Sequence, residues 1–560
     1  MTAPYDLPLS VLHWGAALAC ALCLAACGGG GGSSDGGMPT PPPAPDPQFR
    51  VSGPTPFTAG CDLAPAVGTL YVNAEVEPMI SVNPRNTQNL VGVWQQDRWS
   101  NGGSRGLLTG MSLDGGTTWT THMAAFSHCT GGNEVNGGDY PRASDPWVSF
   151  GPDGTVYQSS LSFGGDVLAP GSFSAILVSR STDGGSTWSN PATVIRDSQQ
   201  AFNDKDSITA DATDARFVYA VWDRLDSDTH GPTYFNRTVD SGLTWETARA
   251  IYDPGANRQT INNQVVVLPS GTLVNFFTQL NAVPGVPAGA MLSLVRSTDK
   301  GVTWAAPIVI SPNLAVGTDN PDTGMPIRDA ASLGSFAAGP HGDLVAAWQD
   351  SRFSNGQRDG IAFSRSQDGG VTWSPVVQIN AVTTVQAFLP SVAVRADGTI
   401  GVTYYDLRNN TAEPTTLPTD VWLTRSTDGI TWRETHVTGP FDLSIAPVDG
   451  GLFVGDYEAL TSVGTMFVPF YVQTNTGNLA NRTDVFATLA ASAVADAAKA
   501  AALDSAASSA RGETVIRAQQ APPLAMTPEW QQKLHASVMR TIKRRLGHEP
   551  QATVPAPQMP

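Results

Sequence analysis

Short runs in which apolar and polar residues alternate cover most of the sequence between residues 60 and 490. Examples are GLLTGMS at 106–112, AILVSRS at 175–181 and GIAFSRS at 360–366. This period of two is typical of half-buried β-strands. Segments such as VVVLPSGTLVNFF and VAVRADGTIGVTYYD join two runs through Ser-Gly or Asp-Gly, which is typical of hairpins. The pattern predicts many short antiparallel strands.

One short phrase recurs after every third strand of this pattern. It reads SLDGGTTW, STDGGSTW, TVDSGLTW, STDKGVTW and SQDGGVTW, with a shortened copy STDGITW at 426–432. Successive tryptophans of the phrase are 57 to 69 residues apart. A repeat of about this length is typical of stacked or radially arranged units. We infer four strands per unit, with the phrase at the turn between the third and fourth strands.

Two further segments complete the count of units. EPMISVNPRNTQNLVGVWQQDR opens a first unit, and GDYEALTSVGTMFVPFYVQT opens a last unit that has no phrase. The expected fold is an all-β, seven-bladed β-propeller of four-stranded blades, and six blades with an irregular tail are the alternative. The last unit has no obvious fourth strand. The segment VGTLYVN at 67–73 could supply it and so remove the sheet edges at the seam.

The phrase matches the Asp-box, also called the BNR repeat, and residues 59–490 resemble sialidase-like propellers. Its Asp can accept hydrogen bonds from the N–H groups of its own turn, its Gly permits an unusual backbone conformation, and its Trp can pack on a neighbouring strand. Each residue is used locally, so we interpret the box as structural. The aspartates concerned are Asp114, Asp183, Asp240, Asp299, Asp368 and Asp428.

Candidate functional residues gather at the opposite ends of the strands. Second strands end in an Asp that precedes an Arg by one or two residues, and first strands begin with acidic residues such as Asp206 and Asp329. Because neighbouring strands are antiparallel, these ends share the face opposite the Asp-boxes, where we expect function. The arginines on this face are Arg98, Arg142, Arg224, Arg328, Arg352 and Arg408.

The resemblance implies particular roles for these residues. Sialidases hold a sialic acid carboxylate with three arginines, and they use a tyrosine nucleophile paired with a glutamate and an acidic proton donor. By position, the arginines above would bind the ligand, Asp145 would be the acid, and Tyr457 with Glu458 would form the pair. Adjacent strand residues point to opposite faces, however. The usual Phe/Tyr-Arg-Ile-Pro motif is absent; YPRASDP at 140–146 is the nearest segment.

Two functions therefore remain open. The first is a surface-anchored propeller that binds a glycan or a surface protein, in which the Asp and Arg residues form salt bridges between strands. The alternative is an exo-sialidase or related glycoside hydrolase that acts on anionic glycans with retaining chemistry. The net charge of −17 excludes nucleic acid as the main partner. We expect a monomer with neither cofactor nor metal, and calcium at 203–206 (NDKD) or 319–322 (DNPD) is a weak alternative.

The first residues resemble a bacterial lipoprotein signal. The apolar run WGAALACALCLAA at 14–26 is too short for a typical membrane span and ends in the lipobox-like LAAC. The resemblance implies a signal peptide at 1–26, a lipid on Cys27, and a Gly/Pro-rich tether at 27–58. The expected location is the bacterial cell envelope, at the periplasmic or outer-membrane surface. An ordinary secretory signal or a buried strand are the alternatives.

Two features remain outside the leader and the repeats. Cys61 and Cys129 are left over. In an exported protein we expect them to form a disulfide, and two free buried thiols are the alternative. After an Ala-rich linker at 491–526, residues 527–547 have the caps and the four-residue apolar spacing of a basic amphipathic helix. Such a helix could dock on the acidic propeller, on a membrane surface or on a partner.

Overall fold

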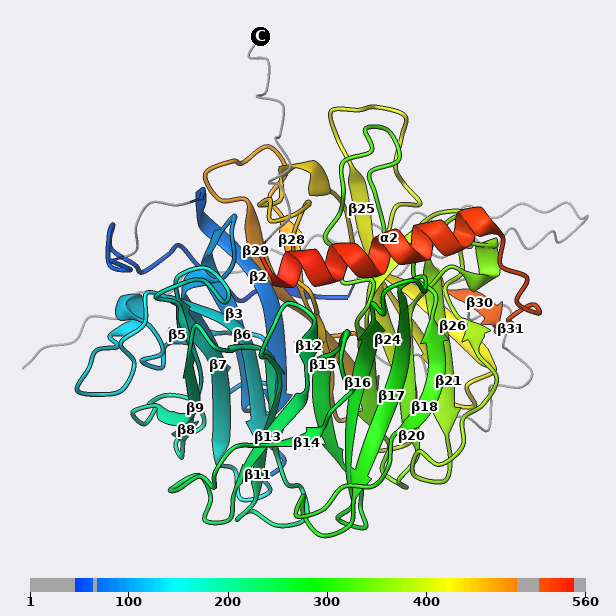
Figure 1. Cartoon of the computed structure of the whole chain (residues 1–560). Coiled ribbons are helices and arrows are strands. Elements are labelled where there is room, and N and C mark those ends of the chain that lie inside the picture. Colours follow the sequence, from blue (N-terminus) through cyan, green and yellow to red (C-terminus); the bar gives the residue numbers. More distant parts are fainter. Residues whose placement is uncertain (1–45, 64–67, 491–512, 548–560) are drawn as a thin grey trace, which may run out of the picture. The chain divides into compact units, whose positions relative to one another are not determined.

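The computed structural model describes residues 46–63, 68–490 and 513–547, and the statements below concern this part of the chain. It consists mainly of antiparallel strands, with one α-helix, α2 (Pro528–Arg545), lying across one end of the sheets (Figure 1). Three short 3-10 helices interrupt the loops. They are η1 (His128–Thr130), η2 (Arg352–Ser354) and η3 (Leu443–Ile445). The described helices are not long and apolar enough to cross a membrane.

The strands form six hydrogen-bonded sheets within the described residues. The largest contains β2 (Leu70–Val82), β3 (Leu90–Trp99), β4 (Ser104–Ser112), β5 (Thr120–His122), β6 (Arg142–Phe150), β7 (Val156–Gly164), β8 (Phe173–Ser181) and β9 (Ala192–Ser198). The next contains β10 (Phe202–Ala210), β11 (Val218–Leu225), β13 (Thr233–Thr238) and β14 (Arg249–Tyr252). The third contains β12 (His230–Gly231), β15 (Arg258–Val267), β16 (Leu273–Asn281), β17 (Gly289–Ser297) and β18 (Ile308–Asn313).

The remaining three sheets follow in chain order. One contains β19 (Gly334–Ala338), β20 (Leu344–Asp350), β21 (Gly360–Ser366), β22 (Val377–Gln378) and β31 (Gln519–Gln520). Another contains β23 (Ala387–Val394), β24 (Ile400–Asp406), β25 (Pro418–Ser426), β26 (Thr431–Asp442) and β30 (Thr514–Arg517). The last contains β27 (Ala459–Val463), β28 (Met466–Thr474), β29 (Thr483–Thr488) and β1 (Gln48–Arg50).

The first strands of the repeats form a closed ring. β2 contacts β6, and the contacts continue through β10, β15, β19, β23 and β27 back to β2. The largest sheet consists of two groups of four strands, which are joined only by the pairing of Ser104 with Ala143. This arrangement is a β-propeller with a small C-terminal helix, as the repeat pattern predicts.

The strand that closes the ring is not the predicted one. Residues 70–73 of the predicted segment belong to β2, the first strand of the first repeat, whereas β1 pairs with β29 at the outer edge of the last sheet. Gln48 on β1 donates to the hydroxyl of Tyr471 at 2.8 Å. The predicted tether at 27–58 therefore ends too late, because its last residues belong to the propeller.

The predicted linker at 491–526 also contains strands. β30 pairs with β26, and β31 pairs with β22, so each adds an outer strand to a sheet. Ile516 of β30 packs beside the buried Trp432, which explains why this segment docks despite its polar surroundings. Only residues 513–526 of the predicted linker are described, together with the predicted helix, which the structure confirms as α2.

The Asp-boxes are structural, as predicted. In the box at 238–245, Asp240 accepts hydrogen bonds from the backbone N of Thr244 at 2.9 Å and from its hydroxyl at 2.6 Å. These hydrogen bonds lower the pKa of Asp240 to about 2. The box tryptophans pack on the preceding repeat: Trp304 lies 5.4 Å from Phe235 between ring centroids, and Trp119 lies 5.9 Å from Phe470 of the last sheet. The box therefore fixes a turn and joins neighbouring sheets.

The predicted disulfide is also confirmed. Cys61 and Cys129 are bonded, with Cα atoms 4.9 Å apart. The bond ties the segment before β2 to η1. The predicted signal peptide and the lipidated Cys27 lie outside the described residues.

Because the box tryptophans are packing residues, replacing one of them should lower the stability of the fold. Trp432 is fully buried and its ring centroid lies 4.9 Å from that of Phe363. Trp432→Ala is expected to cost about 3–5 kcal/mol of unfolding free energy, measured by urea denaturation. Ile430→Ala is the matched control, because Ile430 in the same box is 56% exposed. Equal stability of the two variants would contradict a structural role for the box.

Candidate functional site

The candidate site is built on a repeated irregularity of the first strands. β2, β6, β10, β15 and β23 each contain a bulge. At each bulge one residue other than glycine has a positive φ, which is an uncommon conformation often found at functional sites. These residues are Glu77, Asp145, Lys205, Asn262 and Leu389, with φ between 49° and 63°. The bulge recurs with different residue types, so it is a feature of the fold. Only β2, β6 and β10 carry charged residues at this position, so the charges lie on one side of the ring.

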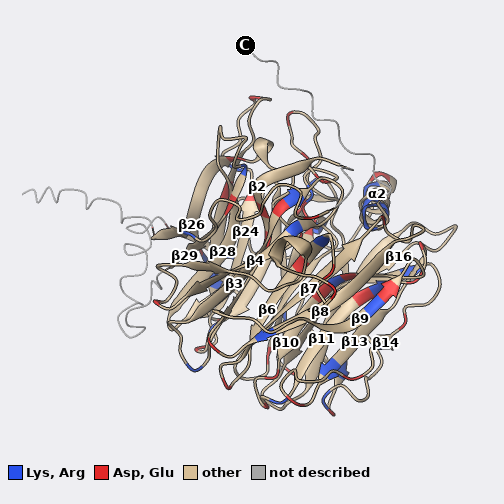
Figure 2. Ribbon diagram, turned by 90° about the vertical axis from the view of Figure 1, so that its left-hand side faces the viewer, with Lys and Arg blue, Asp and Glu red and all other residues tan. Residues whose placement is uncertain are grey.

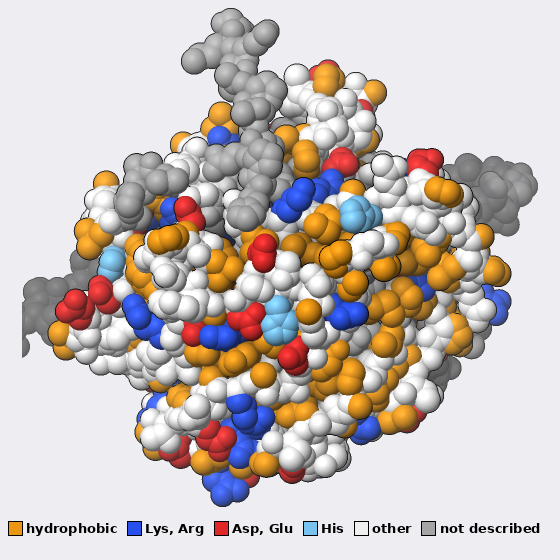
Figure 3. Space-filling model, in the orientation of Figure 1, with side chains coloured by type: hydrophobic (Ala, Val, Ile, Leu, Met, Phe, Trp, Pro, Cys, Tyr) orange, Lys and Arg blue, Asp and Glu red, His pale blue; other side chains and the backbone are white. Residues whose placement is uncertain are grey.

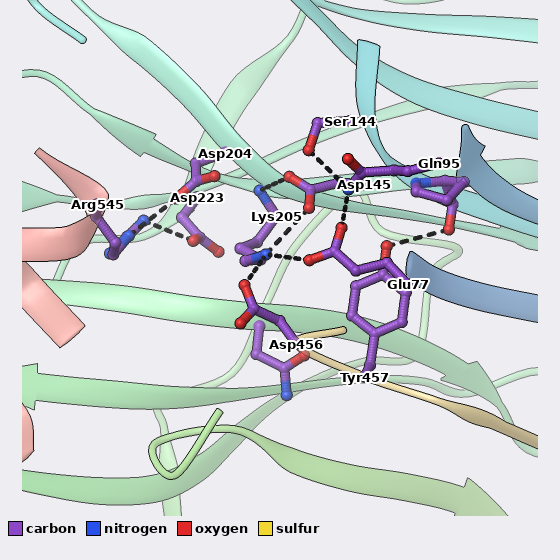
Figure 4. Close-up of polar contacts among 12 residues, drawn as sticks. Glu77, Gln95, Ser144, Asp145, Asp204, Lys205, Asp223, Asp456, Tyr457 and Arg545 are labelled. Carbon is purple, nitrogen blue, oxygen red and sulfur yellow. Dashed lines mark hydrogen bonds and ion pairs between the residues drawn. The ribbon is translucent and has the colours of Figure 1, made fainter. Parts of the chain in front are cut away.

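Lys205 is the centre of the charged side. Its Nζ lies 3.3 Å from Glu77 Oε1, 3.0 Å from Asp145 Oδ1 and 2.7 Å from Asp456 Oδ2 (Figure 4). Asp456 comes from the loop before β27. We call these four residues the Lys205 cluster. Red and blue segments lie side by side on strands near the middle of the molecule in Figure 2.

An aromatic wall and a small cavity adjoin the cluster. The rings of Tyr457 and Trp147 meet edge to face, with centroids 5.4 Å apart. The Tyr457 hydroxyl donates to the carbonyl oxygen of Pro146 at 3.2 Å. The cavity has a volume of about 160 Å³ and is lined by both rings, Asp456, Asn262 and Leu389, among others.

The surroundings of Glu77 and Asp456 shift the pKa values of these two carboxyl groups in opposite directions. Burial raises the pKa of Glu77 to about 8, although Lys205 opposes this. Burial would also raise the pKa of Asp456, but Arg328 and Lys205 outweigh it and hold that pKa well below its usual range. At neutral pH, Glu77 therefore keeps its proton while Asp456 is ionised. Burial and the nearby carboxylates raise the pKa of Tyr457, so its hydroxyl stays protonated.

Two of the six predicted arginines converge beside the cluster. Arg328 donates through Nε to Asp456 Oδ1 at 2.8 Å and through Nη1 to Asp449 Oδ2 at 2.8 Å. Arg98 donates to the same oxygen of Asp449. Both guanidinium groups also lie over the ring of Phe453, at 4.7 and 4.3 Å from its centroid. One carboxylate is thus held by two arginines.

The other predicted arginines have partners elsewhere. Arg224 contacts Asp197 at 2.8 Å, and Arg352 contacts Asp350 at 2.7 Å. Arg408 contacts both Asp406 at 2.6 Å and Glu434 at 2.7 Å. Arg142 donates to Asn101 and to the carbonyl oxygen of Gly102 at 2.9 and 2.8 Å. Arg224, Arg352 and Arg408 thus form salt bridges, as the salt-bridge interpretation of the sequence predicted.

The predicted pair of Tyr457 and Glu458 is not brought together by hydrogen bonds. Glu458 accepts from the backbone N of Val472 at 3.0 Å, away from the hydroxyl of Tyr457. Glu77, which sequence reasoning missed, lies beside Tyr457, and its carboxyl group accepts from Lys205 and Gln95 (Figure 4). A signal was present: Glu77, Asp145 and Leu389 all precede a proline at the same point of their strands. The third predicted catalytic residue, Asp145, does lie in the cluster.

In the segment NDKD at 203–206, Lys205 contacts Asp145 and Asp204 contacts Arg545. Among the described residues, three or more His, Cys, Asp or Glu side chains are nowhere grouped so that they could hold a metal ion.

The C-terminal helix ends at this site. Arg545, in the last turn of α2, donates to Asp204 Oδ2 at 3.0 Å, to Asp223 Oδ2 at 2.6 Å and to Gln259 Oε1 at 3.0 Å. Asp223 lies at the end of β11, whereas the Asp-box of this sheet follows the far end of β13. The helix therefore docks on the acidic propeller, on the face opposite the Asp-boxes.

Comparisons with known proteins agree with this architecture. Residues 232–446 match the family model described as a BNR repeat-like domain. A sialidase of Micromonospora viridifaciens is 27% identical over 365 residues, which are 59% of this chain and 51% of that protein. This chain is thus aligned with only about half of its curated relative. The β-propeller thus contains a BNR repeat-like domain at 232–446, and the chain is similar to a sialidase.

Solved structures with similar folds include three of different kinds. A protein of unknown function from Dyadobacter fermentans is 18% identical, with a TM-score of 0.40 over 60% of this chain and 93% of that one. The Hadza microbial sialidase Hz136 is 17% identical, with a TM-score of 0.39 over 73% and 75%. A Penicillium chrysogenum α-L-arabinanase is 13% identical, with a TM-score of 0.42 over 80% and 99%. Likeness at this level bears neither on the site nor on a reaction.

The raised pKa of Glu77 predicts a pH dependence of stability. The folded value of about 8 lies above the ordinary value of 4.5, so the folded state holds an extra proton between these values. Unfolding free energy must therefore fall as pH rises from 4.5 to 8. Glu77→Gln should remove up to about 1.4 kcal/mol per pH unit of this slope, measured by urea denaturation across the window. Glu529→Gln, at an exposed position of α2, is the control. Identical slopes for wild type and Glu77→Gln would contradict the assignment.

Proposed function

We propose that this protein binds a glycan at the Lys205 cluster and that the cluster has the chemistry of a retaining glycoside hydrolase. The observation that supports this most is the pair Glu77 and Asp456. Both carboxyl groups contact the same ammonium, yet their pKa values are shifted in opposite directions. Pairs of this kind divide the acid role from the nucleophile role.

The geometry favours the retaining mechanism over the inverting one. Distances of 3.3 and 2.7 Å to one Nζ keep the nearest oxygens of Glu77 and Asp456 closer than the roughly 6.5–9.5 Å between carboxyl groups of inverting enzymes. Protonated Glu77 would give its proton to the departing oxygen, and ionised Asp456 would attack or stabilise the sugar carbon. Tyr457 keeps its proton, so it serves this proposal as a wall of the site rather than as a nucleophile.

We propose that the glycan carries a carboxylate. Arg98 and Arg328 already hold a carboxylate, that of Asp449, between two guanidinium groups. Guanidinium groups are the side chains best suited to bind carboxylates in this way. A sugar acid could take the place of Asp449 without rearranging either arginine. The sialidase among the relatives supports the same ligand class.

Two further proposals concern the whole molecule. The closed contacts of β2, β6, β10, β15, β19, β23 and β27 support seven blades rather than six. The disulfide between Cys61 and Cys129 supports export, because disulfides persist in oxidising compartments. We therefore retain the cell envelope as the proposed location, with the lipid anchor at Cys27.

The proposal predicts a loss of turnover on changing either carboxyl group. Glu77→Gln and Asp456→Asn should each lower kcat on a fluorogenic sialic acid glycoside by about 10²–10⁴-fold, while Glu77→Gln still binds the sugar. Arg328→Lys should weaken binding instead, because an ammonium lacks the planar fork with which a guanidinium group holds a carboxylate through two N–H donors.

Arg408→Lys is the control, since Arg408 contacts only its own sheet in the pairs given above. An equal loss of turnover in Arg408→Lys at unchanged stability would contradict the site. Binding of sialosides without turnover, abolished by the Arg328 change, would restrict the function to glycan binding.

A further inference from the structure

The candidate site is closed in this structure. The side chains of Glu77, Asp145 and Asp456 are only 1%, 2% and 7% exposed. The adjoining cavity of about 160 Å³ is smaller than the roughly 300–1,000 Å³ of usual ligand pockets. A glycan therefore needs some part of the covering structure to move.

The last turn of α2 contacts the chain on two sides of the Lys205 cluster. At its C-terminal end, Arg545 reaches Asp204 and Asp223, and Arg544 donates to the carbonyl oxygen of Gly450 at 3.3 Å. Asp204 precedes Lys205, and Gly450 follows Asp449, so the last turn contacts both sides of the charged region. Figure 1 shows the helix lying across the ends of several sheets, and Figure 3 shows charged and hydrophobic side chains intermixed on the surface seen from the same side.

The helix also packs against one residue of the cavity wall, Leu333. Val538 and Ile542 pack in one cluster with Leu333 and Ile261. Leu333 in turn lines the cavity. Thr541 and Ser332 approach within 3.0 Å through their hydroxyl oxygens. Lifting the helix would expose Leu333 as well as Asp204, which adjoins Lys205 in sequence.

The other end of α2 has a separate anchor. Trp530 donates through Nε1 to the hydroxyl of Ser351 at 2.8 Å. Its ring rests on Gly356, where an added Cβ would lie 2.2 Å from the Trp530 Cγ. Leu534 packs nearby with Leu314. A substitution at Gly356 therefore disturbs the docking of α2, while the sequence of α2 and the residues of the Lys205 cluster stay unchanged.

We propose that α2 is an autoinhibitory cover, which blocks the Lys205 cluster when docked and admits a glycan when it lifts. The effect of α2 on glycan binding rests on the proposed function, whereas the docking and lifting of the helix do not. β30 and β31 hold the chain to the propeller before α2, so a lifted helix stays attached and can dock again. Arg545 binds Asp204 and Asp223 in the place that a group of an external ligand would otherwise take.

Hydrogen exchange tests the cover independently of any ligand. An isolated helix of this length is marginal in water, so lifting should expose its amides. Amides of 528–545 are expected to exchange at least about tenfold faster than those of β11, and a further tenfold faster in Gly356→Ala and Trp530→Ala. Lys533→Ala is the control, because Lys533 contacts only Glu529 among the ion pairs of the described residues. Exchange of α2 only at the rate of β11 would overturn the proposal.

A reversible lock tests the consequence for the site. Ser332→Cys combined with Thr541→Cys places two thiols where hydroxyl groups lie 3.0 Å apart. Oxidation of this full-length variant should lower sialoside binding and turnover at least about tenfold, and dithiothreitol should restore both. Wild type treated in the same way is the control, because it carries the disulfide of Cys61 and Cys129.

The outcomes separate the two proposals. If the locked and unlocked forms bind the sialoside equally, the cover is wrong while the glycan site stands. If α2 opens by hydrogen exchange but neither wild type, Gly356→Ala nor the unlocked variant binds a sialoside, the proposed function fails and the cover stands.

Discussion

A buried ammonium group holds the centre of this protein together. A charge in this position is costly unless it is paired, and Lys205 is paired with carboxylates from three separate parts of the chain. These parts are β2, β6 and the loop before β27, so the cluster joins the two ends of the ring. The carboxylates around Lys205 outnumber the single ammonium, and Arg328 neutralises Asp456 in addition. Glu77 is left as the group that keeps a proton, which is the basis of the chemistry proposed for the site.

Aspartate and arginine serve two purposes on the same face. Arg352 and Arg408 are held by carboxylates two residues before them, which fixes the ends of the second strands. Arg98 and Arg328 reach inward and share Asp449. The residue types are alike in both cases. What differs is the backbone that carries them. Arg352 and Arg408 follow the ends of β20 and β24, whereas Arg98 lies within β3 and Arg328 lies in the loop before β19.

The fold was largely predictable from the sequence, and the site only in part. The Asp-box was predictable because its hydrogen bonds lie within one turn, as Asp240 and Thr244 show. β1 was not, because it has three residues in a Pro-rich stretch and owes its position to a distant strand. Asp145 and Arg328 could be placed by strand position. Glu77 could not be paired with Tyr457, because no local pattern reports a contact between residues that far apart in sequence.

The closure of the ring has a consequence for the order of folding. β1 is near the beginning of the chain, but its partner β29 is near the end, and Ser52 bonds to Asp484 across 432 residues. The outer strand of the last sheet must therefore wait until almost the whole propeller has been synthesised. Contacts of such long sequence separation form slowly. The ring cannot be completed on an emerging chain, so β1 stays unpaired until β29 has been synthesised.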